Sequence, residues 1–223
     1  MTTAILDRDL TAESLGAIAT AIPGATAVLR RYKLDFCCGG DVPLAEAAAR
    51  RGLDAWTIAA ELAGLAPQPE EALPGDPDAL IDLIETRYHA AHRREVPELV
   101  RLARRVEAVH AEHPRRPAGL ADLLTRMEAE LESHMQKEEQ VLFPMMRRGG
   151  HPMIGQPIGM MRHEHDDHGE HLRELEALTE GFTPPEGACR TWRALYAGLD
   201  HLTGELMRHI HIENSILFPR FGA

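Results

Sequence analysis

A histidine followed four residues later by a glutamate occurs twice in this sequence, and a Phe-Pro pair follows each copy at the same distance. The equivalent residues are 75 positions apart: His134 and His209, Glu138 and Glu213, Phe143-Pro144 and Phe218-Pro219. In an α-helix, two residues four positions apart lie on the same face, one turn from each other. A neutral imidazole nitrogen and a carboxylate arranged in this way can bind one metal ion together.

Each copy is preceded by a segment that carries another histidine. His89 and His165 are 76 positions apart, close to the offset of the other pairs. A lone histidine on a helix is more often a surface or core residue, but the duplication predicts a pseudo-two-fold metal site at the centre of a four-helix bundle. Four helices then supply four imidazoles and two carboxylates: His89, His134, Glu138, His165, His209 and Glu213.

The ligand types indicate which metal this site would bind. No cysteine stands at ligand spacing in the bundle, which disfavours thiolate-bound zinc and iron–sulfur clusters. A closed structural zinc site takes four ligands, whereas six are offered here. Mixed imidazole and carboxylate ligands favour two iron ions, with manganese as the alternative. A solvent-derived oxo or hydroxo bridge could fill one further position, and the remaining open positions could bind O₂ or NO.

Other acidic and imidazole side chains stand close to these ligands in the sequence. Glu130 and Glu205 lie one turn before the ligand histidines, and Glu164 adjoins His165. Each of them could be a surface charge or a packing residue, or it could form part of a route for protons and iron beside the metals. His92 and His168 each follow a candidate ligand by three residues, and their role is left open.

The pair Cys37-Cys38 is the other chemical feature of the sequence. A disulfide between neighbouring residues is strained, so two free thiols are expected. The pair could be buried and structural. Because Gly39-Gly40 follows it and would break a helix, we favour an exposed turn whose thiols exchange electrons or contact a metal or a partner.

The elements that must position these residues are expected to be helices, because no convincing alternating strand pattern occurs. The predicted fold class is all-α, with a small helical domain over 1–65, a Pro-rich linker over 66–78 and a bundle over 79–221. The expected short helices cover about 12–21, 24–32, 43–51 and 55–63. The expected long helices cover about 79–112, 117–147, 158–181 and 186–219.

Composition restricts the possible partners. The net charge of −11 argues against binding to DNA or RNA, which requires clustered basic residues. No run approaches the roughly 18–20 apolar residues that a membrane span needs. The N-terminal residues lack the features of a signal peptide, and three cysteines do not form a disulfide framework. We therefore expect a cytoplasmic protein.

Several segments together resemble the iron–sulfur cluster repair di-iron proteins, the RIC family. They are Tyr32-x-x-Asp35-Phe36-Cys37-Cys38-Gly39-Gly40, Arg87-Tyr88-His89, His134-x-x-x-Glu138-x-x-x-x-Phe143-Pro144, Glu164-His165-Asp166 and His209-x-x-x-Glu213-x-x-x-x-Phe218-Pro219. The resemblance covers nearly the whole chain. It implies a hemerythrin-like up-down four-helix bundle behind a Cys-Cys domain, in a cytoplasmic homodimer. It also implies two iron ions bridged by Glu138 and Glu213, with Glu130 and Glu164 on the route to the metals.

Three functions remain open at this point. The resemblance implies repair of iron–sulfur clusters damaged by nitrosative or oxidative stress, with damaged iron–sulfur proteins as partners and with Cys37 and Cys38 accepting iron or NO or docking the client. A second possibility is an enzyme that reduces NO to N₂O at the iron pair. A third is a carrier or sensor of O₂ or NO, for which the bundle alone would suffice.

Overall fold

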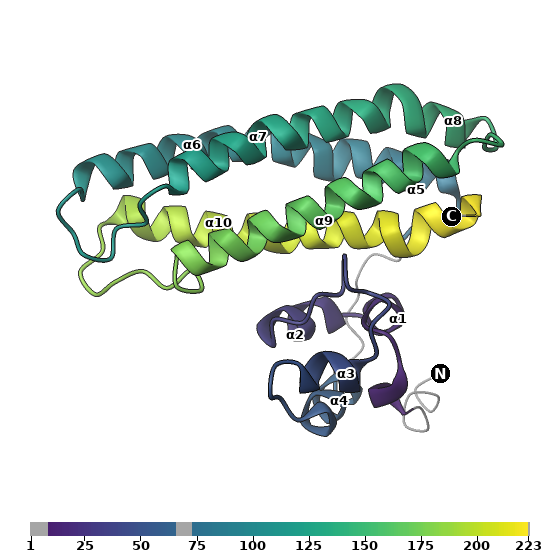
Figure 1. Ribbon diagram of the computed structural model, residues 1–223, viewed down its shortest axis with the longest axis horizontal. Coiled ribbons are helices and arrows are strands. Elements are labelled where there is room, and N and C mark those ends of the chain that lie inside the picture. The colour runs from purple at the N-terminus through teal and green to yellow at the C-terminus, as the bar shows by residue number, and fades with distance from the viewer. Residues whose placement is uncertain (1–8, 66–72, 223) are drawn as a thin grey trace. The chain divides into compact units, whose positions relative to one another are not determined.

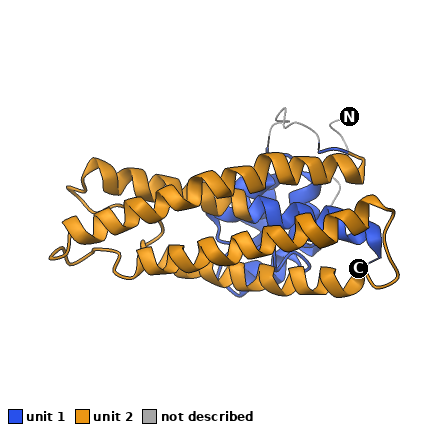
Figure 2. Ribbon diagram, turned by 90° about the horizontal axis from the view of Figure 1, so that it is seen from above, with its two compact units in different colours: residues 1–74, 207–222 blue, residues 75–206, 223 orange. Residues whose placement is uncertain are grey.

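The computed structural model describes residues 9–65 and 73–222, and the regular elements within them are helices (Figure 1). The prediction of an all-α fold is confirmed. The chain divides into two compact units (Figure 2). Unit 1 contains the described residues up to 74 together with residues 207–222, and unit 2 contains residues 75–206.

Unit 1 begins with a set of short helices whose bounds lie close to the predicted ones. They are the 3₁₀ turn η1 (Leu10–Ala12), α1 (Leu15–Ala21), α2 (Ala25–Arg31), α3 (Leu44–Ala49) and α4 (Ala55–Ala63). The side chain of Ser14 caps α1 and that of Asp54 caps α4, each by accepting a hydrogen bond from a backbone N–H of the first turn. Their apolar faces meet around Leu29, Phe36 and Leu44, all fully buried.

Unit 2 is built from long helical segments that run side by side in alternating directions (Figure 1). They are α5 (Pro77–Leu83), η2 (Ile84–His89) and α6 (Ala90–Val109); α7 (Leu120–Lys137), η3 (Glu138–Leu142) and α8 (Phe143–Arg147); α9 (Gly155–Leu178); and α10 (Arg190–His211), as far as residue 206. The helix of α6 continues through Pro97. The segments α10, η4 (Ile212–Leu217) and η5 (Phe218–Phe221) follow one another without a break into unit 1.

The core of unit 2 follows from the helical period of its apolar residues. In α10, Trp192, Leu195, Leu199 and Leu202 recur at intervals of three or four, and each is fully buried. Such a stripe covers one face of a helix and drives that face into the bundle. Helix packing of this kind holds the ligand-bearing side chains in fixed positions.

The domain limits 1–65, 66–78 and 79–221 stay predictions. Residues 66–72 of the expected linker lie outside the described residues. The described part of that linker leads into Asp76, whose side chain caps α5. None of the helices in the described part combines the length and the hydropathy that a membrane span requires.

The loop that contains Gly39 and Gly40 lies tightly against the start of α1. The carbonyl oxygen of Gly40 accepts a hydrogen bond of 2.8 Å from the backbone N–H of Gly16. A Cβ atom on Gly40 would lie only 2.9 Å from the carbonyl oxygen of Phe36. Glycine is required at this position because two backbone segments approach each other closely.

We predict that Gly40→Ala destabilises the protein by about 1–3 kcal/mol, because the added methyl group meets rigid backbone. Gly159→Ala in α9 is the matched control, since no atom lies within 4 Å of its added Cβ. That variant should gain roughly 0.5–1 kcal/mol from better helix propensity. Urea unfolding of the metal-free proteins measures both changes, and equal stability of the two variants would contradict the packing argument.

Candidate metal centre

The six predicted ligands are buried although all of them are polar. Their exposed fractions are at most 1%: His89, His134, Glu138, His165, His209 and Glu213. Burial of a carboxylate away from water is costly unless a positive charge or hydrogen bonds compensate for it. The buried carboxylates of Glu138 and Glu213 would therefore be stabilised by a cation.

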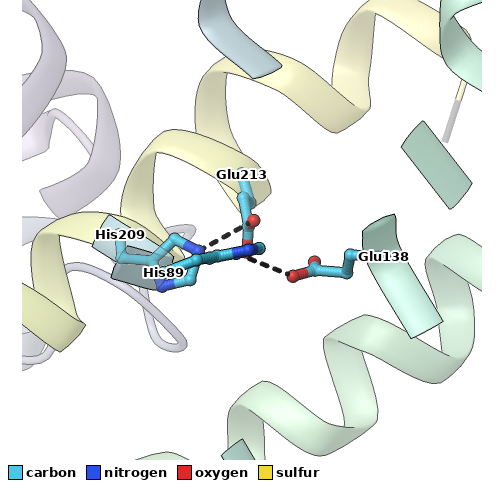
Figure 3. Close-up of side chains that lie close together, drawn as sticks. All are labelled: His89, Glu138, His209 and Glu213. Carbon is cyan, nitrogen blue, oxygen red and sulfur yellow. Dashed lines mark hydrogen bonds and ion pairs between the residues drawn. The ribbon is translucent and has the colours of Figure 1, made fainter. Parts of the chain in front are cut away.

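These six residues form two groups of possible ligands. In each group the ligand atoms lie within 4.8 Å of one another: His89, Glu138, His209 and Glu213 in the first, and His134, Glu138, His165 and Glu213 in the second. Both carboxylates belong to both groups. Figure 3 shows the carboxylates of Glu138 and Glu213 directed toward the rings of His89 and His209. Nε2 of His209 lies 3.0 Å from Oε1 of Glu213 on the same helix.

Three π-helical segments coincide with these ligands. His89 ends η2, Glu138 begins η3 and Glu213 lies in η4. A π-turn inserts a residue into a helix and often occurs at a functional site, because it changes the direction in which side chains point. The simple four-residue spacing in the sequence did not predict these segments.

The repeated Phe-Pro pairs come directly after two of the π-segments. Pro144 and Pro219 lack the N–H that an α-helix would use to bond the carbonyl four residues earlier. Phe143 and Phe218 are fully buried and belong to the core. The prolines do not end the helical path at once, because α8 and η5 continue it for a short distance.

His134 is oriented by Glu164, which lies on α9. Nδ1 of His134 donates a hydrogen bond of 2.9 Å to Oε2 of Glu164, and Lys137 forms an ion pair with the same carboxylate. The hydrogen bond from His134 is the main reason that the pKa of Glu164 falls to about 2. With its proton on Nδ1, a neutral His134 ring presents the lone pair of Nε2 to the buried group. Nε2 lies 3.5 Å from Oε2 of Glu138.

His89 has an analogous partner in Glu139. Nδ1 of His89 lies 2.8 Å from Oε1 of Glu139, and Arg93 binds the carboxylates of both Glu139 and Glu132. Nε2 of His89 therefore also faces inward, 3.3 Å from Oε2 of Glu138. A neutral imidazole lone pair and a carboxylate oxygen at this distance repel each other unless a positive charge lies between them.

The donor set therefore fits a pair of metal ions. One oxygen of Glu138 is approached by His89 from the first group and by His134 from the second. A carboxylate placed between two imidazoles in this way can bridge two cations. Partners that fix the tautomer of a ligating histidine are typical of metal sites. Sequence reasoning missed Glu139, although it adjoins the predicted ligand Glu138 and carries a carboxylate that can accept a hydrogen bond from a ligand histidine.

The remaining candidates lie outside the two groups. Glu205 forms an ion pair of 2.5 Å with Arg87, and this ion pair explains its position without a role at the metals. Glu130 is largely exposed and belongs to a separate group with His168 and His171. His92 is buried but belongs to neither ligand group. The pKa of His168 falls to about 2, chiefly through burial and secondly through its histidine neighbours.

Cys37 and Cys38 are free thiols whose sulfur atoms lie 3.7 Å apart. The expectation of an exposed turn is wrong for Cys37, which is only 3% exposed, whereas Cys38 is half-buried. The reason is Asp35, since one of its carboxylate oxygens accepts hydrogen bonds from both backbone N–H groups and from the Cys37 thiol. The hydrogen bond with Cys38, burial and the negative charges nearby raise the pKa of Cys37 well above its usual value.

The cysteine loop is also bound to the last helical segment, within unit 1. Nδ2 of Asn214 donates a hydrogen bond of 3.0 Å to the carbonyl oxygen of Cys37. His211 packs edge-on against Phe36, and its Nε2 lies 3.2 Å from the hydroxyl of Thr20. Burial lowers the pKa of His211 to about 4. His211 is not in either ligand group, because it lies two positions after His209 and so faces a different side of the helix.

Known proteins agree with this arrangement. The model of the hemerythrin HHE cation-binding domain matches residues 81–221, and that of the ScdA_N domain of unknown function matches residues 11–66. The iron-sulfur cluster repair protein YtfE of Citrobacter koseri is 49% identical over 210 residues, which cover 93% of this chain and 96% of the relative. The YtfE proteins of Escherichia coli O157:H7 and Dickeya chrysanthemi are 49% and 46% identical, with the same coverage. The chain belongs to the YtfE family.

Membership of the YtfE family confirms the resemblance inferred from the sequence. The hemerythrin match spans the bundle and includes all six buried donors. The hemerythrin match and the six buried donors together support iron binding by this chain. The match over residues 11–66 includes Cys37 and Cys38, so the likeness to the YtfE family extends beyond the bundle.

We predict that Glu164→Gln weakens iron binding about 10–100-fold, because a neutral amide accepts the Nδ1 hydrogen bond of His134 more weakly than a carboxylate and no longer raises the basicity of the ring. Chelator competition measures the iron affinity. Glu170→Gln on the exposed side of α9 is the control and should leave the affinity unchanged. Equal iron affinity of the Glu164→Gln variant and the unaltered protein would contradict the role given to Glu164.

We also predict that iodoacetamide modifies Cys38 before Cys37 in the folded protein. Only the thiolate reacts, and a raised pKa together with burial keeps Cys37 protonated and covered. Tandem mass spectrometry of the peptide that contains both cysteines gives the order of modification. In the Asp35→Asn variant, which removes a negative charge, Cys37 should react faster. Modification of Cys37 first in the unaltered protein would refute this account.

Proposed function

We propose that this protein repairs iron–sulfur clusters damaged by nitrosative or oxidative stress, and that it does so by donating iron from a di-iron centre. The curated relatives that share 46–49% of its residues are named iron-sulfur cluster repair proteins. The observation that carries the proposal is the pair of buried His/Glu groups that share both carboxylates.

In this proposal each iron ion has two imidazole ligands. His89 and His209 would hold one ion and His134 and His165 the other, while Glu138 and Glu213, which belong to both groups, would bridge them together with a solvent-derived oxo or hydroxo group. The geometry around Glu138 supports this assignment, because His89 and His134 approach the same oxygen. The iron pair supplies Lewis acidity and redox chemistry when it is bound.

A centre of this kind suits the release of iron. The ligands are nitrogen and oxygen atoms, and no thiolate takes part, so ferrous iron is held less firmly than in a sulfur-ligated site. Two imidazoles and two shared carboxylates also leave each ion below six ligands. Glu138 belongs to both ligand groups, so its carboxylate would still be held by one ion if the other were given up.

We assign to Cys37 and Cys38 the contact with the client or the first acceptance of iron or NO. The two sulfur atoms and a carboxylate oxygen of Asp35 lie within 4.8 Å of one another and could bind one ion. An arriving cation would favour the thiolate forms, against the raised pKa of Cys37. The bond from Asn214 to Cys37 connects this loop to the residue that follows Glu213.

Glu130 and Glu164 belong, in this proposal, to the route that iron and protons take. Glu164 accepts the Nδ1 proton of His134 and also pairs with the half-exposed Lys137, so it connects a ligand to the solvent side of α9. Damaged iron–sulfur proteins are the proposed partners. A cytoplasmic location and a homodimer remain predictions from the resemblance.

The open positions on the iron ions also suit small ligands such as NO and O₂. They favour, as a second candidate, reduction of NO to N₂O with electrons from a partner, or carriage or sensing of either gas. The cysteine loop distinguishes these functions from iron donation, because neither of them needs Cys37 or Cys38. Anaerobic turnover of NO with a chemical reductant would test the enzymatic alternative.

Iron transfer to a damaged cluster tests the proposal directly. The ⁵⁷Fe-loaded protein is mixed anaerobically with a hydro-lyase whose cluster has been oxidised to the [3Fe–4S] form, and dithionite supplies the one electron that rebuilding requires. We expect ⁵⁷Fe in the restored [4Fe–4S] cluster. Cys37→Ser/Cys38→Ser should slow the transfer at least about tenfold, and His134→Ala should abolish the iron supply.

Cys189→Ser is the matched control for the cysteines, since this residue lies in unit 2 beside His110. It should transfer iron at the rate of the unaltered protein. Full transfer by the Cys37→Ser/Cys38→Ser variant would refute the role of the cysteine pair alone. No transfer from a protein that contains two irons would refute iron donation itself.

A further inference from the structure

A second cluster of possible metal ligands lies between α7 and α9, within unit 2. Glu130 on α7 and His168 and His171 on α9 place one ligand atom each within 4.8 Å of one another. Oε2 of Glu130 lies 3.2 Å from Nδ1 of His171. None of the three residues belongs to the two groups that contain Glu138 and Glu213. The proposed di-iron centre does not explain why they converge.

His168 is the residue that requires an explanation. It is only 2% exposed, and neither of its ring nitrogens has a hydrogen-bond partner among residues 9–65 and 73–222. A buried polar group without a partner destabilises the folded state. If position 168 only filled space in the core, a leucine or methionine side chain would be more stable there than histidine. A buried imidazole directed to a carboxylate and a second imidazole is instead suited to binding a cation.

The three side chains are of the types that bind ferrous iron. Two imidazoles and one carboxylate leave open positions on the metal and are typical of mononuclear non-haem iron sites. His168 and His171 are three residues apart, so they lie on the same face of α9. Glu130 faces them from the neighbouring helix. Its negative charge would offset part of the charge of the ion.

The three ligands also differ in depth. The side chain of Glu130 is 47% exposed, that of His171 is 17% exposed, and His168 is 2% exposed. The ring of His168 packs edge-on against that of His134, with 5.2 Å between the ring centroids. The cluster therefore extends from the solvent to a proposed ligand of the di-iron centre.

We propose that Glu130, His168 and His171 form a second cation site, which holds a single ferrous ion on its way to or from the di-iron centre. This inference rests on the proposed function for the direction of iron movement, but the binding of the ion rests on the cluster alone. The second site also specifies the role of Glu130. On the proposed iron route, Glu130 would bind the ion together with His168 and His171.

Metal binding by the whole protein tests the site. Protein loaded with two irons per chain is dialysed anaerobically against increasing concentrations of ferrous iron, and bound iron is counted. The unaltered protein should bind one further ion. His171→Ala and Glu130→Gln alter side chains that are not fully buried. Each should lower the affinity for this further ion at least about tenfold, while the other two irons remain bound. His163→Ala, an exposed histidine of α9, is the matched control and should bind the further ion normally.

The outcomes separate this inference from the proposed function. Absence of a third ion in the unaltered protein, or equal binding by all four proteins, would overturn the second site. If the unaltered protein bound fewer than two other irons, the di-iron centre would fail, and the loss of one ion in His171→Ala would still identify the second site.

The rate at which metal-free protein fills the di-iron centre tests the direction of movement. His171→Ala should fill it more slowly than His163→Ala, to the same final occupancy. Equal rates would show that the ion at Glu130, His168 and His171 does not supply the centre.

Discussion

Burial of two carboxylates among imidazoles is the constraint on which the rest of this structure depends. Glu138 and Glu213 have no access to solvent, and Nε2 of His89 and Nε2 of His134 lie 3.3 and 3.5 Å from Oε2 of Glu138. Such an arrangement is stable only when positive charge lies between the groups. Two metal ions would supply that charge, and the long helices of the bundle supply the rigidity that keeps the donors together.

The surrounding residues maintain this constraint. Glu164 and Glu139 hold the Nδ1 protons of His134 and His89, and Lys137 and Arg93 keep those carboxylates ionised and in place. The π-segments direct His89, Glu138 and Glu213 inward at the cost of regular hydrogen bonding. Helix packing and metal binding therefore depend partly on the same residues, because His89 and His134 each have a carboxylate partner on another helix.

The sequence predicted much of this. A repeated His-x-x-x-Glu pair with a constant offset predicted the all-α bundle and the six buried donors, because helical spacing and metal chemistry both constrain those positions. It did not predict the π-segments, which depend on how the helix meets its neighbours, or the pairing of Glu139 with His89 across two helices. Burial of Cys37 was also missed, because it follows from Asp35 folding back over the loop. The spacing drew attention to His168 but left its role open, and the convergence of His168 and His171 with Glu130 became visible only once α7 and α9 were placed together.

The most direct test of the central claim is the iron content and the Mössbauer spectrum of protein isolated from iron-replete cells without added metal. Two irons per chain, with a diamagnetic ground state from antiferromagnetic exchange in the diferric form, would support a bridged pair at Glu138 and Glu213. One zinc ion per chain, or two irons with independent paramagnetic spectra, would contradict it.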